Sequence, residues 1–308
     1  MFRWKKLGNI FCPDNNYPWM VSHAANPFPV FTSEQIMRVY FTTRDKSNRS
    51  HVAYADFDTY NKFKVVDLCN RPVIEPGGLG YFDDSGAAMG YFLEHEGNKF
   101  IYYLGWNLKV TVPWQNSIGL AVAAAGSDTF IKYSQAPLLD RSSEDPFSIS
   151  YPALLFENKK FRMWYGSNLS WGSDQREMHH VIKYAESDDG IHWVRKNQIC
   201  IDLKYQNEYA ISKPFVLKSD EFYNMWYSYR ANEMTTTYRI GYAVSKDGIN
   251  WVRKDELAGI NVSNEGWDSE MICYASVFRH LDRHYMLYNG NGFGKTGFGV
   301  AMEDHHGD

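Results

Sequence analysis

Short apolar runs rich in aromatic residues recur along the chain at nearly constant spacing. Successive runs are 62, 62, 62 and 61 residues apart, and they begin at Val39, Ile101, Met163, Met225 and Met286. Each run follows a short polar turn, and another apolar stretch precedes that turn, as at residues 152–156. Two apolar stretches joined by a short turn are typical of a β-hairpin. The spacing therefore predicts five copies of a unit about 62 residues long.

A second hairpin signal follows within each unit. It is clearest at residues 184–196 and 242–254, where Tyr-Ala-x-Ser-x-Asp-Gly-Ile-x-Trp-Val-Arg-Lys recurs. The Asp-Gly pairs favour tight turns because glycine tolerates a positive φ. Each unit is then four antiparallel strands, and four-stranded units repeated around an axis form a β-propeller. No long segment has a helical period, so we predict an all-β fold: one five-bladed β-propeller domain spanning residues 1–308.

The fifth unit ends without the Trp-Val-Arg-Lys strand that completes the earlier ones. The N-terminal sequence Phe-Arg-Trp-Lys-Lys resembles that strand. Trp4 precedes Pro27 by 23 residues, and Trp193 precedes Pro214 by 21, so the spacing to the next unit also matches. We therefore predict that residues 2–7 form the outer strand of the last blade, which would close the ring and remove an exposed edge.

Charge and cysteine content narrow the possible partners and location. The net charge is −4 and no basic run stands out, so a nucleic-acid partner is not expected. The longest apolar stretches, such as 118–125, are too short to span a bilayer, so no membrane partner is expected. The N-terminus lacks a signal-peptide core, and the four cysteines form no CxxC pair. We expect a cytoplasmic protein without a metal site or other cofactor.

The loops that lead into the first strand of each blade converge at one mouth of the central channel, and they contain acidic residues. Glu208 and Glu270 lie 62 residues apart, on the repeat period, and are the first candidates for general acid and base. Asp84 is the third candidate. A carboxylic acid that protonates a leaving oxygen and a carboxylate that activates water or attacks directly are what glycosidic-bond chemistry requires. The alternative is that these are solvated loop acids.

Other residues near the same mouth are candidates for binding substrate. We expect this role for His23, Arg44, Asp45, Trp106, Arg230 and Tyr274. The two arginines each end a second strand, where they suit an anionic group or pair with a neighbouring loop acid. Aromatic residues make up 17% of the chain, and rings such as Trp106 can stack on sugars as well as fill a core. The expected partner is a carbohydrate or glycoconjugate.

The five-fold repeat and the Tyr-Ala-x-Ser-x-Asp-Gly-Ile-x-Trp pattern resemble the five-bladed propeller glycoside hydrolases of families 43, 32 and 130. The segment at 288–299 is similar to the ending of uncharacterised bacterial proteins of that superfamily. Families 43 and 32 have Asp directly before the first-blade Pro, where this chain has Asn26. Two further acids of family 43 are replaced by Tyr151 and Ser212.

The resemblance implies a glycan-processing enzyme, in the first place a glycoside hydrolase, although the acids of that family are missing. Glycosyl transfer on the same fold is an alternative reaction. A carbohydrate-binding propeller without catalysis is a second class of function, and a protein-interaction scaffold is a third.

Overall fold

The computed structural model describes residues 2–171, 178–230 and 237–304. In these ranges the secondary structure is almost entirely β, with twenty strands, one 3₁₀ turn at Asp255–Leu257 and one helical turn, α1, at Asn291–Gly294. No helix in the described residues has the length and apolar character needed to cross a membrane. The prediction of an all-β fold is confirmed.

The strands form five antiparallel units of four. Unit 1 contains β2 (Ser22–Phe31), β3 (Ile36–Arg44), β4 (Ser50–Asp58) and β5 (Lys64–Leu68). Unit 2 contains β6 (Gly86–His95), β7 (Asn98–Leu108), β8 (Trp114–Ala123) and β9 (Ile131–Lys132). Unit 3 contains β10 (Ile149–Glu157), β11 (Lys160–Trp171), β12 (Met178–Ser187) and β13 (Trp193–Ile201). Unit 4 contains β14 (Ala210–Lys218), β15 (Tyr223–Arg230), β16 (Arg239–Ser245) and β17 (Trp251–Arg253). Unit 5 contains β18 (Cys273–His280), β19 (Arg283–Asn289), β20 (Phe298–Glu303) and β1 (Trp4–Phe11).

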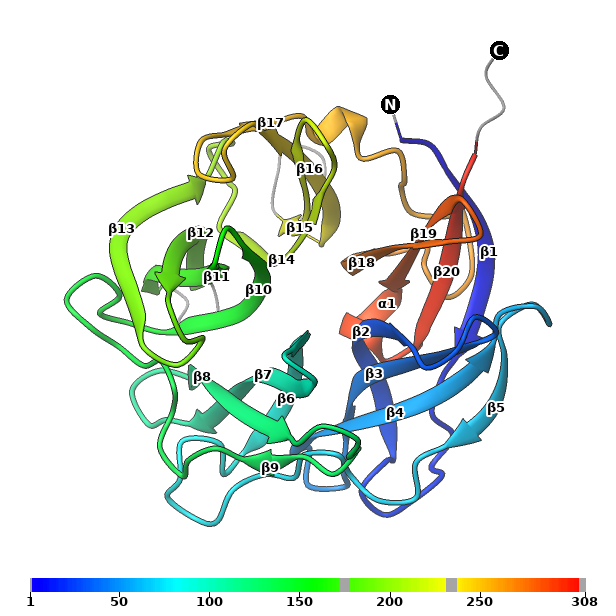
Figure 1. Cartoon of the computed structure of the whole chain (residues 1–308), viewed down its shortest axis with the longest axis horizontal. Coiled ribbons are helices and arrows are strands. Elements are labelled where there is room, and N and C mark those ends of the chain that lie inside the picture. The colour runs from blue at the N-terminus through cyan, green and yellow to red at the C-terminus, as the bar shows by residue number, and fades with distance from the viewer. Residues whose placement is uncertain (1, 172–177, 231–236, 305–308) are drawn as a thin grey trace.

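Figure 1 shows the five units around a common centre, with the first strand of each unit nearest to that centre and strands such as β1, β5, β13 and β17 at the periphery. Each apolar run identified in the sequence is the second strand of a unit, in β3, β7, β11, β15 or β19. The repeat therefore predicted both the number of strands in a unit and the position of its central hairpin.

The N-terminal strand completes the last unit. β1 pairs antiparallel with β20, from Trp4 opposite Glu303 to Phe11 opposite Phe298. Trp4 also contacts the preceding unit, since its indole Nε1 donates to the carbonyl oxygen of Ala258 at 3.0 Å. The predicted outer strand is confirmed, although it runs from Trp4 to Phe11 rather than over residues 2–7.

A buried carboxylate anchors the loop that leads into each of units 2 to 5. Each of these carboxylates binds a basic side chain on the outermost strand of the same unit, at N–O distances of 2.6 to 3.0 Å. The pairs are Asp83–Lys132, Asp145–Arg195, Glu208–Arg253 and Asp268–Lys6. All four acids are at most 4% exposed. We call this carboxylate–base pair the unit tether.

A tyrosine of the second strand belongs to the same arrangement. Tyr103, Tyr165 and Tyr288 donate their hydroxyls to the tether carboxylates of units 2, 3 and 5 at 2.9 to 3.0 Å. In unit 4 the hydroxyl of Tyr227 is bound instead by Asp255, which also accepts from Arg253. Burial and the neighbouring carboxylate raise the pKa of these phenols, so they remain neutral donors.

No such tether is present in unit 1 among the described residues. The repeat position of the tyrosine is taken by Phe41, which is fully buried in an apolar cluster with Met20 and Phe57. The phenyl ring of Phe41 has no hydroxyl that could donate to a carboxylate. A carboxylate buried beside it would lack this partner, and burying a charge without partners is costly.

Each inner strand contains a bulge at an equivalent position. The pairing register shifts just after Ala25, Ala88, Ser150, Ser212 and Cys273. Four residues at these bulges have positive φ, namely Asn26, Tyr151, Lys213 and Tyr274. A bulge re-aims side chains and often lies beside an active site, and backbone strain of this kind concentrates at functional sites.

Replacing Trp4 with alanine tests the contribution of the N-terminal strand. Trp4 is 8% exposed and packs against Trp226 of unit 4, so Trp4→Ala should cost about 3 kcal/mol of unfolding free energy and lower the melting temperature by several degrees. Lys5→Ala, at an exposed position of the same strand, is the control and should melt like the parent chain. Equal melting of both variants would contradict this role for β1.

Candidate functional site

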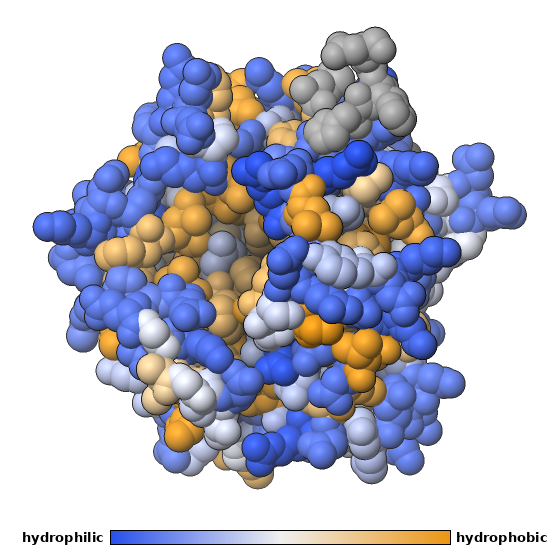
Figure 2. Space-filling model, turned by 45° about the vertical axis from the view of Figure 1, so that its right-hand side comes forward, coloured by the Kyte–Doolittle hydropathy of each residue, from blue (hydrophilic) through white to orange (hydrophobic). Residues whose placement is uncertain are grey.

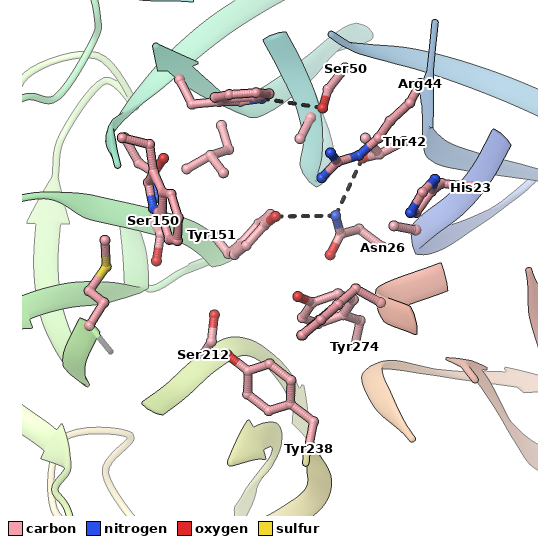
Figure 3. A pocket seen from close by; sticks show the side chains of 18 of the residues that line it. His23, Asn26, Thr42, Arg44, Ser50, Ser150, Tyr151, Ser212, Tyr238 and Tyr274 are labelled. Carbon is pink, nitrogen blue, oxygen red and sulfur yellow. Dashed lines mark hydrogen bonds between the residues drawn. The ribbon is translucent and has the colours of Figure 1, made fainter. Parts of the chain in front are cut away.

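A cavity of about 540 Å³ lies where the inner strands begin. Its lining comes from the first residues of the inner strands, the last residues of β3, β7 and β15, and the first residues of the third strands. All five units therefore contribute to it. Figure 2 shows a central hollow whose visible walls are largely hydrophobic, and Figure 3 shows the side chains that converge on the cavity.

Aromatic side chains further along the inner strands pack against one another. Phe28, Tyr91 and Phe215 lie on three different inner strands, with ring centroids 4.7 to 6.1 Å apart. Lys213 crosses the same region with a fully buried side chain, and its Nζ donates to the carbonyl oxygen of Gly90 at 2.9 Å. Burial lowers the pKa of this amine to about 7.

Asn26 and three tyrosines occupy the centre of the cavity (Figure 3). The Asn26 amide nitrogen donates to Thr42 at 3.3 Å and to Tyr151 at 3.5 Å, whereas its buried Oδ1 has no hydrogen-bond partner within the described ranges. The rings of Tyr151 and Tyr274 lie 5.9 Å apart. Burial raises the pKa values of Tyr151, Tyr238 and Tyr274, so all three phenols are neutral hydrogen-bonding groups at physiological pH.

Two arginines reach the cavity from different units. Arg44 ends β3 and donates to the side chain of Asn48 at 2.8 Å. Arg230 ends β15, and its guanidinium lies over the rings of Tyr209 and Tyr238 at 4.7 and 5.0 Å. Neither makes an ion pair with any carboxylate of the described residues.

Two neutral histidines add to the lining. Burial, with Arg44 and Lys295 nearby, lowers the pKa of His23 to about 4, and burial lowers the pKa of His180 to about 4. The Nδ1 atom of His180 lies 2.8 Å from the carbonyl oxygen of Ile211. Because a carbonyl only accepts, Nδ1 carries the hydrogen and Nε2 is left as an acceptor.

Indole rings form one wall of the cavity. Trp106 forms part of this wall, and its Nε1 donates to the hydroxyl of Ser50 at 3.2 Å. Trp114 also lines the cavity and meets Trp171 edge-on, with centroids 5.4 Å apart. A fixed ring face of this kind can stack on the apolar face of a sugar ring.

The structure brings together five of the six residues expected to bind substrate: His23, Arg44, Trp106, Arg230 and Tyr274 all line the cavity. Asp45 does not. Its carboxylate accepts from the backbone N–H groups of Ser47 and Arg49 and from the side chain of His51, so it organises its own turn.

The three carboxylates expected to act as acid and base are not brought together, and none lines the cavity. Both oxygens of Glu208 are bound by Arg253, at 2.8 and 2.9 Å. Asp84 accepts from Gly80 and Ser85 within its own loop. Glu270 has an exposed side chain. No Asp or Glu is present among the described residues of the lining.

Positions that are equivalent in the structure of the units differ from those suggested by the 62-residue spacing of these acids. Glu208 is equivalent to Asp268, because each pairs with a base on the outermost strand of its unit. The 62-residue spacing from Glu208 to Glu270 therefore does not mark equivalent side chains.

Sequence reasoning missed several lining residues, including Asn116, His180 and Tyr238. They lie at or just before the starts of third strands, which reach the same mouth as the starts of first strands. The four-stranded repeat could have identified them. The first and third strands of an antiparallel unit run in the same direction, so both begin at the same mouth. Over the described residues, no three His, Cys, Asp or Glu side chains cluster in a way that could hold a metal ion.

Several solved structures with a similar fold are named as glycoside hydrolases. One named "Glycoside hydrolase" aligns with a TM-score of 0.74 at 15% identity, covering 97% of this chain and 90% of the other. A thermostable family-43 glycoside hydrolase aligns at 0.66 and 15% identity, covering 93% and 91%. A structure from a study of family 130, described as mannoside phosphorylases that include hydrolases of β-1,2 mannosidic linkages in Candida mannan, aligns at 0.66 and 13% identity, covering 100% and 94%. The resemblance to the propeller glycoside hydrolases is thus confirmed at the level of the fold.

Sequence comparison identifies much nearer relatives. No protein-family model matches the chain. The Mycobacterium tuberculosis protein named "Uncharacterized protein Rv1502" is 42% identical over 299 residues, which cover 97% of this chain and 98% of the relative. The protein MT1551 of a second strain matches equally, at 42% over 299 residues. The chain belongs to the family of these two mycobacterial proteins.

The buried amine of Lys213 should make stability depend on pH. Because the unfolded chain keeps the ordinary lysine pKa, it binds a proton between about pH 7 and about pH 10.4 that the folded chain does not bind, and stability should rise with pH over that window. Lys213→Met removes this penalty. The variant should be more stable than the parent at about pH 6, and its advantage should shrink towards about pH 10. Urea unfolding at both pH values measures this, with Lys246→Met as the exposed control.

Glu208→Gln distinguishes a structural from a catalytic carboxylate. Removing the charge leaves Arg253 without its bidentate partner in a buried position, so we expect a loss of about 3 kcal/mol in unfolding free energy. Glu265→Gln, at an exposed loop position, should be neutral. Chemical denaturation of the two variants gives the answer, and a Glu208→Gln chain as stable as the parent would refute the tether.

Proposed function

We propose that residues 1–308 form one closed five-bladed β-propeller and that the protein is a glycan-processing enzyme whose substrate occupies the central cavity. Five four-stranded units, the N-terminal strand paired into the fifth, and the fold shared with glycoside hydrolases support this proposal. The fold alone does not specify a reaction, because one fold can carry several chemistries.

The composition of the cavity wall is the observation that carries the proposal. Sugars present apolar C–H faces and many hydroxyls, and the cavity pairs indole and phenol rings with neutral hydrogen-bonding groups. Trp106 offers a ring face, while Asn26, Tyr151 and Tyr274 offer donors and acceptors within one space of about 540 Å³. A volume in this range accommodates a ligand of one or two sugar rings.

Hydrolysis of a glycosidic bond is the leading reaction, and Glu270 is the first of the three acids to test. Glu208 and Asp84 are bound by neighbouring groups. Glu270 is exposed, and the next residue, Met271, packs with the cavity-lining Tyr238 and Tyr274. A carboxylate at this place is free to meet a substrate that projects from the mouth. Glycosyl transfer to phosphate or another acceptor would use the same geometry.

Carbohydrate binding without catalysis is the second candidate function. It is favoured by the lack of any carboxylate among the described residues that line the cavity, because hydrolysis by acid and base normally needs a pair of them. We also place the protein in the cytoplasm, a proposal supported by its four unpaired cysteines.

Binding and turnover should be measured together on one set of proteins. Calorimetric titration with mono- and disaccharides should detect binding to the parent chain, and Trp106→Ala should weaken it about tenfold, which corresponds to about 1.4 kcal/mol of lost stacking. Tyr60→Ala, at an exposed ring outside the cavity, should bind like the parent. No binding by any sugar would overturn the proposal.

Nitrophenyl glycosides and native oligosaccharides test the reaction. If hydrolysis is correct, Glu270→Gln should lose most of its kcat while keeping its affinity for sugar. Binding that persists without turnover in the parent chain would select the non-catalytic candidate instead.

A further inference from the structure

We propose that the occupant of the cavity is an acidic carbohydrate, a sugar carrying a carboxylate or a phosphate, with Arg44 and Arg230 as the residues that bind its anionic group. The inference rests on the proposed function, which places a carbohydrate in this cavity, and it adds the charge of that carbohydrate.

The pairing of arginines elsewhere in the chain shows how unusual these two are. Four arginines with side chains at most 15% exposed each bind a carboxylate at 3.0 Å or less. The pairs are Arg38–Asp56, Arg162–Glu157, Arg195–Asp145 and Arg253–Glu208. Arg44 and Arg230 are half-buried, yet neither has a carboxylate within 4 Å among the described residues. Arg239 is also half-buried without a carboxylate partner among the described residues, but it donates to the carbonyl oxygens of Tyr238 and Glu270. Arg44 and Arg230 are the two half-buried arginines of the described residues that line the cavity.

The setting of Arg230 prepares it for a ligand. Its guanidinium lies over the rings of Tyr209, Tyr238 and Phe293, at 4.7 to 5.8 Å from their centroids. Its Nε is buried and has no hydrogen-bond partner among the residues that the structure describes. Packing on rings fixes the plane of the guanidinium without satisfying its N–H donors. A planar fork of unused donors matches the oxygens of a carboxylate or a phosphate.

Arg44 reaches the cavity from unit 1, at the end of β3. Figure 3 shows its guanidinium directed towards the space above Asn26. One Nη donates to the neutral side chain of Asn48, which orients the group but supplies no negative charge. The same charge helps to lower the pKa of His23 and opposes the rise in the pKa of Tyr151, so its field reaches both side chains.

Nothing else in the described lining balances these two charges. His23 and His180 are neutral, and so are the three tyrosines. A cation held away from water without a counter-ion is costly, and an entering anion removes that cost. The unpartnered Oδ1 of Asn26 adds an acceptor that needs a hydroxyl donor. An acidic sugar carries both an anionic group and hydroxyls on one small molecule, so it meets both requirements.

Matched pairs of ligands test this inference on the full chain. Glucuronate, galacturonate, N-acetylneuraminate and glucose 6-phosphate would be titrated by calorimetry, with glucose, galactose and N-acetylmannosamine as the neutral counterparts. At least one acidic sugar should bind at least about tenfold more tightly than its neutral counterpart, because charge-assisted hydrogen bonds are roughly twice as strong as neutral ones. Its affinity should fall as salt is added. Comparing the affinities of the sugar carboxylates with that of glucose 6-phosphate shows which of the two anionic groups the site binds.

Variants assign the effect to the two arginines. Arg44→Gln and Arg230→Gln should each remove most of the preference for the acidic ligand, while Arg44→Lys and Arg230→Lys, which keep the charge but lose the fork, should remove less. Arg141→Gln is the control, since Arg141 is exposed and outside the cavity. Circular dichroism and melting curves establish that each variant is folded.

The outcomes separate this inference from the proposal beneath it. Neutral and acidic sugars binding equally, or an acidic preference unchanged in both glutamine variants, would overturn the acidic carbohydrate and leave the glycan site standing. No binding of any sugar would overturn both.

Discussion

The unit tether is the interaction on which the rest of the structure depends. A carboxylate that is nearly inaccessible to water is stable only if its charge is matched and its oxygens are bonded. In units 2 to 5 a lysine or arginine of the outermost strand provides the charge, and in three of them a tyrosine of the second strand adds a hydrogen bond. The carboxylate side chain thus joins the loop before the inner strand to the outermost strand of the same unit. In units 2 to 5 the start of the inner strand, where the cavity lies, is therefore fixed by a contact with the outermost strand of the same unit.

This arrangement explains which features of the structure the sequence predicted and which it did not. The aromatic runs predicted the second strands because all three residues of each run are buried. Trp4 predicted the N-terminal strand because it repeats the pattern of Trp193. A carboxylate near the start of an inner strand, however, can point towards the axis or towards the outer strand, and repeat spacing does not distinguish the two. Glu208 points to Arg253, so a position that suggested catalysis serves the fold.

The binding residues were easier to predict than the acids for a related reason. Arg44 and Arg230 follow directly from the ends of second strands, whose direction the hairpin pattern determines. Asp45 is one residue further on, and that single step moves it from the cavity into a turn that uses its carboxylate. The bulges at Asn26, Tyr151 and Tyr274 could not be predicted, because a positive φ at a non-glycine residue leaves no signal in a single sequence.

The same bulges connect the fold to the chemistry of the cavity. Their backbone strain is held by cross-unit hydrogen bonds, such as those from the N–H of Asn26 to Asn289 and from the N–H of Tyr274 to Ser228, both at 2.8 Å. These bonds set the direction of the side chains at the cavity centre before any ligand arrives. A pre-oriented site loses less entropy on binding, and here the oriented groups are neutral donors and acceptors that share the cavity with two arginines lacking a carboxylate partner among the described residues. The tethers use most of the buried carboxylates to hold the units together, whereas the described lining of the cavity contains two arginines and no carboxylate.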